Sequence, residues 1–257
     1  MEFGQNIDAK YEKSRAKLKD SLDVLGGLEN ISLSAVGRVR NKAIEAGSMY
    51  GLSMVNSEEF ENIPQEELKK YFGRELKTIK SAYSFGRESL GDKVTRDFLE
   101  ELNFKAAPEV KDFGYGYRQT KMEIRDSKHT PVSADKVPEQ MRNYTEKLSE
   151  KLQSNDKMEL VETAISAYVD LVEIHPFYKG NGRTSRIVHS AILEKAGVPL
   201  PVLGDNDRRE YYPLMEDTFV NGKNYAEGEM SPQKKMLHSY MMDKIRDSVD
   251  EVIEASK

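Results

Sequence analysis

The residues best suited to chemistry lie between His175 and Arg186, in the segment HPFYKGNGRTSR. His175 can take a proton from an attacking hydroxyl group, because the unperturbed pKa of an imidazole lies near ~6.5. Gly180 and Gly182 let main-chain amides approach an anion closely. Arg183 and Arg186 can make forked contacts with phosphate oxygens. A base, an amide cradle and two guanidinium groups are the parts needed to transfer a phosphorus-containing group.

Two apolar helices should hold this segment in place. The run 158–174 is apolar on adjoining stripes, which is typical of a helix buried in the middle of a bundle. A second apolar run, 187–196, ends at Gly197, a common helix stop. We therefore expect a tight loop between two helices, with both arginines on one face of the second helix near its N-terminus. The dipole of that helix favours a bound anion at this end.

The same segment resembles the signature of the Fic family, H-x-F-x-[D/E]-G-N-G-R-x-x-R. The matching residues are His175, Phe177, Gly180, Asn181, Gly182, Arg183 and Arg186. The resemblance implies a mainly α fold, a Fic-type helical bundle with one short β-hairpin flap. It also implies transfer of AMP from ATP to a Ser, Thr or Tyr hydroxyl of a target protein. In that case His175 is the base, Asn181 and the amides around it hold the phosphates, the arginines clamp the outer phosphates, and Phe177 anchors the loop.

Lys179 departs from this signature, because it stands where the family has an acidic residue that holds Mg²⁺ against the nucleotide. A lysine has no acceptor atom, so it cannot be a ligand to a hard cation. We therefore expect no protein metal ligand at this position, and the need for Mg²⁺ stays open. Lys179 can replace the metal as a point charge on the phosphates, or it can favour a different phosphate-containing donor. The alternative is a degenerate Fic domain that binds nucleotide or protein without turnover.

A helix over 34–47 carries a weaker resemblance. Many Fic proteins have an N-terminal inhibitory helix whose glutamate pairs with the last arginine of the signature. Residues 41–46, NKAIEA, contain the glutamate, Glu45, but lack the hydroxyl residue and the small residue of that pattern. The resemblance implies a Glu45–Arg186 pair that restrains activity, and the alternative is that Glu45 is a solvated helix residue.

Residues 117–125 alternate imperfectly between apolar and polar side chains, and 129–132 return after a turn, which predicts a short hairpin. This hairpin resembles the flap of Fic proteins, which pairs with the backbone of the target protein by strand addition. The resemblance assigns Lys121, Met122, Glu123 and Ile124 to target docking. Arg118 is expected to be structural rather than catalytic, and His129 to be an exposed loop residue.

Tyr211 follows the signature helix and a loop that ends near residue 209. The resemblance implies a tyrosine wall on the adenine side of the nucleotide, where the ring of Tyr211 would stack on the base. The alternative is that this tyrosine packs between helices.

The composition narrows the remaining classes. The chain has 257 residues, 32% of them charged, a net charge of −5 and no cysteine. These features argue against a nucleic-acid surface and exclude disulfides, thiol catalysis and cysteine-held zinc. No apolar run is long enough to span a membrane. We expect a cytoplasmic protein, while delivery into another cell and homo-oligomer formation stay open.

The predicted helices divide the chain into an N-terminal helical extension, 1–90, and a Fic-type core with C-terminal helices, 91–257. The helices are expected at 7–28, 34–47, 57–90, 93–102, 137–152, 158–174, 187–196, from 210 onward and at 232–254. Residues 103–116 are expected to form a loop.

Overall fold

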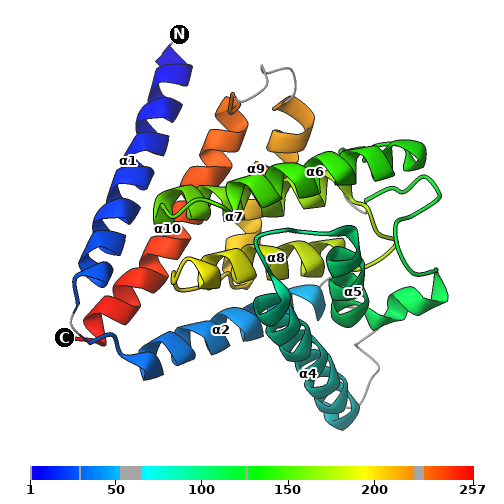
Figure 1. Cartoon of the computed structure of the whole chain (residues 1–257), viewed down its shortest axis with the longest axis horizontal. Helices are drawn as coiled ribbons and strands as arrows, with labels where there is room; N and C mark the ends of the chain where they lie inside the picture. The colour runs from blue at the N-terminus through cyan, green and yellow to red at the C-terminus, as the bar shows by residue number, and fades with distance from the viewer. Residues whose placement is uncertain (1, 29, 53–64, 125–126, 223–228) are drawn as a thin grey trace.

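A computed structural model describes residues 2–28, 30–52, 65–124, 127–222 and 229–257 (Figure 1). The α-helices are α1 (Glu2–Gly26), α2 (Leu33–Leu52), α4 (Gln65–Ser89), α5 (Arg96–Ala106), α6 (Val137–Lys151), α7 (Lys157–Ile174), α8 (Asn181–Lys195), α9 (Asp205–Asn221) and α10 (Pro232–Glu254). Two short 3-10 helices, η1 (Pro108–Asp112) and η2 (Ala134–Lys136), lie between α5 and α6. The expected mainly α fold is confirmed.

Helix α7 lies in the middle of the bundle and packs against α6, α8 and α10 (Figure 1). Asp156 caps its N-terminus, since the carboxylate accepts from the amides of Met158 at 2.7 Å and Glu159 at 3.0 Å. Its apolar residues are buried around most of its circumference, as the adjoining stripes predicted. A helix buried on this scale provides a rigid support for the residue that follows it.

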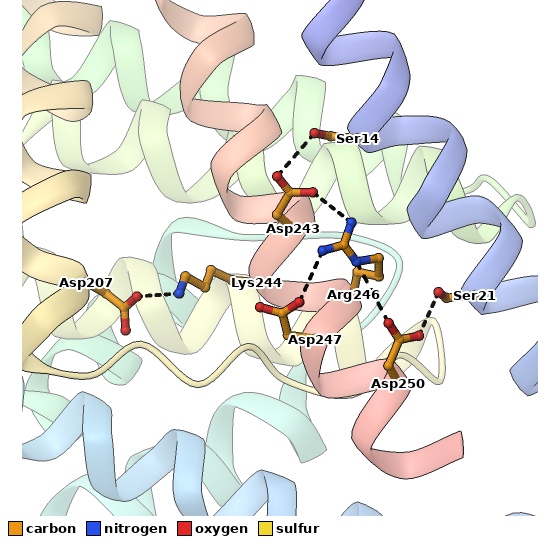
Figure 2. Close-up of polar contacts among 8 residues, drawn as sticks. All are labelled: Ser14, Ser21, Asp207, Asp243, Lys244, Arg246, Asp247 and Asp250. Carbon is orange, nitrogen blue, oxygen red and sulfur yellow. Dashed lines mark hydrogen bonds and ion pairs between the residues drawn. The ribbon is translucent and has the colours of Figure 1, made fainter. Parts of the chain in front are cut away.

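Helix α1 runs along α10 (Figure 1). Figure 2 shows polar contacts at this interface, where Ser14 donates to Asp243 at 3.3 Å and Ser21 to Asp250 at 2.7 Å. Arg246 of α10 forms ion pairs with both of these aspartates. In the part of the chain that the structure describes, none of the helices combines the length and apolar character needed to cross a bilayer.

Helix α4 packs closely against α8, the helix that carries the two signature arginines. A Cβ atom placed on Gly86 of α4 would lie 2.6 Å from the Cγ2 atom of Ile187 of α8. The start of α4 predicted near residue 57 lies outside the described residues, and the described helix begins at Gln65. This close approach brings side chains of α4 next to the N-terminus of α8.

The segment predicted as a loop at 103–116 is more ordered than expected. Helix α5 continues to Ala106, and Pro108 begins the 3-10 helix η1. Proline fits the first position of a helix, because its missing N–H would have no partner there. This extension matters because it places residues of α5 and η1 beside the signature loop.

The predicted hairpin is not formed as paired strands in the described residues 117–124 and 127–132. The carbonyls of Thr120 and Val132 instead accept hydrogen bonds from the guanidinium of Arg118. The two arms are therefore bridged by a side chain rather than by a ladder of main-chain bonds. The prediction for His129 was also wrong: it is 5% exposed and packs against the ring of Phe219, with centroids 4.9 Å apart.

Candidate active site

The loop between α7 and α8 contains two backbone conformations in the left-handed region. His175 ends α7 with φ 52° and ψ 57°, and its amide donates to Leu171 O at 3.1 Å. Gly180 precedes α8 with φ 79°. A Cβ atom on Gly180 would lie 2.3 Å from the Cβ of Ala107, so this position requires glycine for both conformation and space.

The interior of the loop is fixed by Phe177 and Asn181. Phe177 is fully buried, as expected, with its ring 5.7 Å from that of Tyr117. The carboxamide of Asn181 accepts from the Phe177 amide at 2.9 Å and donates to the Phe177 carbonyl at 2.8 Å. The side chain of Asn181 is thus occupied in bracing the loop, and its assignment to phosphate is retained only for its main-chain amide.

Asn103 holds the loop from the other side and was not identified from the sequence. Its amide nitrogen donates to the carbonyl of Lys179 at 2.8 Å and to the hydroxyl of Thr184 at 3.0 Å. The residue is 2% exposed. The signal in the sequence was weak, because an asparagine near a predicted helix end is usually read as a helix stop.

His175 is set up as a neutral base. Burial, mainly, together with the charges of Arg118 and His129, lowers the pKa of His175 to about 4, although the Val172 carbonyl opposes this shift. That carbonyl lies 3.4 Å from Nδ1 and can only accept a hydrogen bond, so Nδ1 carries the proton. Nε2 is therefore the acceptor nitrogen, and at neutral pH it is ready to take a proton.

The N-terminus of α8 lies at the other end of the loop from His175. Gly180 has no side chain to bond the first-turn amides, and no such capping bond is present. First-turn amides have no partner within their own helix and carry the positive end of the helix dipole. The amides of Asn181, Gly182 and Arg183 therefore lie at the positive end of the helix dipole, and their role as an anion cradle stays a prediction.

Arg183 is held by two carboxylates that the sequence did not point to. Its Nη1 atom lies 3.1 Å from Glu75 of α4, and its Nη2 atom forms a short ion pair with Glu109 of η1. The Arg183 side chain is 17% exposed. These pairs are missed from sequence because the three residues are far apart in the chain and meet only where α4 and η1 reach α8.

Arg186 lies next to two tyrosines. Burial raises the pKa of Tyr83 and Tyr168, and the charge of Arg186 offsets part of that shift in each. Glu45 pairs with Lys80 at 3.4 Å, and both side chains are exposed. A Glu45–Arg186 pair would require Glu45 to change partner, so the inhibitory role stays a prediction.

Lys179 is exposed, and its Nζ atom lies 5.5 Å from the centre of the Phe113 ring. Among the described residues, no three histidine or acidic side chains come together in a way that could hold a metal ion. The nearby Glu75 and Glu109 are both engaged by Arg183. This donor set does not fit a protein-held Mg²⁺.

Tyr211 does not line the open loop. It is 2% exposed, and its ring stacks on that of Tyr168 with centroids 5.9 Å apart. Because this face of the ring is already covered, Tyr211 packs between helices, the second of the two alternatives. Its assignment to the adenine side is therefore corrected.

The flap residues are presented in an alternating manner. Lys121 and Glu123 are exposed and pair with each other at 3.5 Å, while Met122 and Ile124 are half-buried. Past the turn, Glu216 of α9 accepts a hydrogen bond from Ser127 at 2.5 Å. The flap is therefore extended and anchored to the helical body, although it forms no strand in its described part.

Comparisons with known proteins agree with this geometry. Residues 93–193 match the Fic/DOC family. A protein adenylyltransferase Fic of Nematostella vectensis is 31% identical over 125 residues, which cover 48% of this chain and 28% of that protein. The match thus takes in little more than a quarter of the relative's length.

Solved structures show the same fold. A Fic domain-containing signaling protein from Bacteroides thetaiotaomicron superposes with a TM-score of 0.72 at 18% identity, over 93% of this chain and 96% of that one. IbpAFic2 covalently tethered to Cdc42 gives a TM-score of 0.59 at 18% identity, over 91% and 70% of the two chains. The Fic/DOC match over residues 93–193 includes the loop between α7 and α8.

Proposed function

We propose that this chain transfers AMP from ATP to a Ser, Thr or Tyr hydroxyl of a target protein. The observation that carries the proposal is the contact of His175 Nδ1 with the Val172 carbonyl, which leaves Nε2 as the acceptor nitrogen, on the same loop as the uncapped N-terminus of α8. Relatives of this domain are named protein adenylyltransferases, which supports the same chemistry. A base and an amide cradle at opposite ends of one short loop suit a phosphorus centre attacked by a hydroxyl.

The proposed step is a displacement at the α-phosphorus. Nε2 of His175 takes the proton of the target hydroxyl while the hydroxyl oxygen forms a bond to the α-phosphorus. The bond from that phosphorus to the bridging oxygen of the β-phosphate breaks, and pyrophosphate leaves. Main-chain amides of 181–183 stabilise the charge on the phosphate oxygens, and Arg186 binds the outer phosphates.

Lys179 supplies the positive charge that a metal would otherwise bring to the phosphates. Its side chain is exposed and lies over the ring of Phe113, an interaction worth about 0.5–1 kcal/mol at an exposed site. A phosphate group offers a stronger, charge-assisted partner. Lys179 can therefore leave Phe113 at small cost when the donor binds.

The target protein is proposed to dock on the flap through Lys121, Met122, Glu123 and Ile124. An extended segment with exposed main chain can bind a second extended segment through backbone hydrogen bonds. One structural neighbour was solved in a covalent complex with a protein, Cdc42, which is consistent with protein targets for this fold.

The second candidate is a binding module without turnover. The pairing of Arg183 with Glu75 and Glu109 favours it, because a phosphate-binding arginine is occupied by carboxylates. Lys179 favours it as well, since the metal of ordinary AMP transfer has no protein ligand there. His175 argues for the enzyme, because a binding module needs no neutral base.

A transfer assay separates the two candidates. Purified chain is incubated with α-labelled ATP and lysate, with and without Mg²⁺, beside His175→Ala and Lys179→Glu. The proposal expects label on protein with the wild type in both conditions and none with His175→Ala. Label that appears only with Lys179→Glu and Mg²⁺ would support the binding module instead.

A further inference from the structure

Arg118 is a fully buried arginine whose side-chain hydrogen bonds, among the described residues, all go to main-chain carbonyls. It is 1% exposed. Its Nε donates to His175 O at 2.8 Å, its Nη1 to Thr120 O at 3.0 Å and its Nη2 to Val132 O at 2.5 Å. Its own amide donates to Pro176 O at 2.8 Å. One guanidinium thus connects the two arms of the flap with the backbone of the base.

The charge of Arg118 survives this burial. Burial lowers the pKa of the guanidinium, but arginine starts so high that it stays protonated in proteins. The guanidinium also donates to Ile174 O at 3.5 Å, and only arginine has donors enough, in a fixed planar fork, to satisfy four separate carbonyls in this way. A lysine would keep the charge but could not hold the same geometry.

The backbone of His175 needs such a support. A non-glycine residue at φ 52° lies in a sparsely populated region and persists only where its surroundings hold it there. The bond from Arg118 Nε to the His175 carbonyl, at 2.8 Å, is shorter than the bond from the His175 amide to Leu171 O, at 3.1 Å. The orientation of the imidazole follows from this backbone conformation.

We propose that Arg118 is a positioning residue that fixes His175 relative to the flap. The docked target and the base are then held in register by one side chain. This inference rests on the proposed AMP transfer and adds the element that couples target docking to proton removal. Misplacement of a catalytic group by about 1 Å can lower a rate about 100-fold.

The test compares Arg118→Lys with wild type in transfer from α-labelled ATP to lysate proteins, with ATP varied. We expect a 10- to 100-fold lower maximal rate and an apparent KM for ATP within twofold of wild type, because the donor is held by α8. Arg87→Lys, at an exposed position on α4, is the matched control and should retain the wild-type rate. An unchanged maximal rate in a folded Arg118→Lys would overturn the proposal, as would equal loss in rate and ATP binding.

A spectroscopic readout separates this inference from the proposed function. The ring carbon signal of His175 is followed by NMR against pH in wild type, Arg118→Lys and Arg118→Gln. The charged or titratable groups that act on the ring are Arg118 and His129. Loss of charge in Arg118→Gln should therefore raise the titration midpoint of His175, whereas Arg118→Lys should change the position of the NMR signal more than this midpoint. If wild type shows no transfer, the proposed function fails, and this titration still decides whether Arg118 controls the base.

The wild-type chain offers a measurement that does not depend on a variant that folds. The Nε–H signal of Arg118 reports its bond to the His175 carbonyl. If Arg118 positions His175, this signal should be protected from hydrogen exchange with water and should shift as His175 titrates. A rapidly exchanging signal, or one that ignores the titration, would contradict the proposal.

Discussion

The Nη1 atom of Arg183 lies 3.1 Å from a carboxylate oxygen of Glu75, although the two residues are 108 positions apart in the chain. Glu109 takes the other side of the same guanidinium. A side chain that the signature assigns to phosphate is therefore paired with two anions in the structure. For Arg183 to bind donor phosphates, as proposed, the phosphates have to displace Glu75 and Glu109.

Removal of this competition should tighten donor binding. We expect the double variant Glu75→Gln and Glu109→Gln to bind ATP about 3- to 10-fold more tightly, because charge-assisted bonds to Arg183 are replaced by weaker neutral ones. Calorimetric titration with ATP measures the Kd. Glu88→Gln, an exposed change on the same helix, is the control. Weaker ATP binding in the double variant would show that the carboxylates help to hold the donor.

The predicted restraint by Glu45 can be tested in the same titration. Glu45 faces solvent and pairs with Lys80, so Glu45→Gln should change the Kd for ATP by less than about twofold. A gain as large as that of the double variant would instead support the inhibitory pair with Arg186.

The rate of transfer should not fall near pH 6.5, where a catalytic histidine with an ordinary pKa would become protonated. The folded-state pKa of His175 is lowered to about 4, mainly by burial, so the ring stays neutral well below pH 6.5. At pH 5.5 an ordinary imidazole would be only about one-tenth neutral. We expect the rates at pH 7.5 and 5.5 to agree within about twofold. A tenfold fall, with the fold intact by circular dichroism, would place the pKa near its ordinary value.

Acid should weaken the fold through two other histidines. Burial lowers the pKa of His189 and of His238 to about 3. Between about pH 6.5 and pH 3 these histidines are therefore protonated in the unfolded state but not in the folded state. Stability is therefore present above the unfolded pKa near 6.5 and declines as the pH falls towards 3, by about 1.4 kcal/mol per pH unit for each histidine. His189→Phe should reduce this slope in urea unfolding at pH 7 and 5. An unchanged slope would contradict the assignment.

Gly180 should tolerate no side chain. Its φ of 79° is strained for alanine, and a Cβ atom would collide with Ala107. Gly180→Ala should therefore lower stability by about 2–4 kcal/mol and abolish transfer. Gly197→Ala is the matched control, since Gly197 has φ 68° but no atom within 4 Å of its Cβ position. The free energy of unfolding of the control, measured in urea, should fall by only about 1 kcal/mol. Equal losses in the two variants would show that the contact with Ala107 does not explain the effect at Gly180.

Asn103 should matter for transfer more than its place in a helix indicates. Asn103→Ala removes both bonds that hold the carbonyl of Lys179 and the hydroxyl of Thr184. We expect a rate at least about tenfold lower, because the loop can then shift relative to α8. Asn143→Ala, an exposed change on α6, serves as the control. A wild-type rate in Asn103→Ala would show that Gly180 and Asn181 alone fix the loop.

The sequence predicted most of the fold because the helices are strongly periodic. The buried α7 was expected from its adjoining apolar stripes, and the loop that follows it from two glycines and a distinctive signature. The helix ends were less accurate, as at α5, where Asn103 belongs to the helix rather than to a loop. Local signals place a helix better than they place its last turn.

The parts that the sequence could not show depend on long-range contacts. The pairing of Arg183 with Glu75 needs α4 to lie against α8, and no local pattern encodes that contact. The absence of paired strands in the described part of the flap also depends on a contact that local sequence does not show. The buried side chain of Arg118 donates hydrogen bonds to carbonyls that a hairpin would use for pairing. Tyr211 was open between two roles because an aromatic residue fits both a ligand wall and a helix interface.

The most direct test of the proposed AMP transfer uses ATP labelled at either the α- or the γ-phosphate, in parallel reactions with lysate. We expect protein to retain the α label and not the γ label, and we expect the α label to be lost with His175→Ala. Retention of the γ label alone would show phosphate transfer rather than AMP transfer. An α label that persists in His175→Ala would contradict the role of His175 as the base.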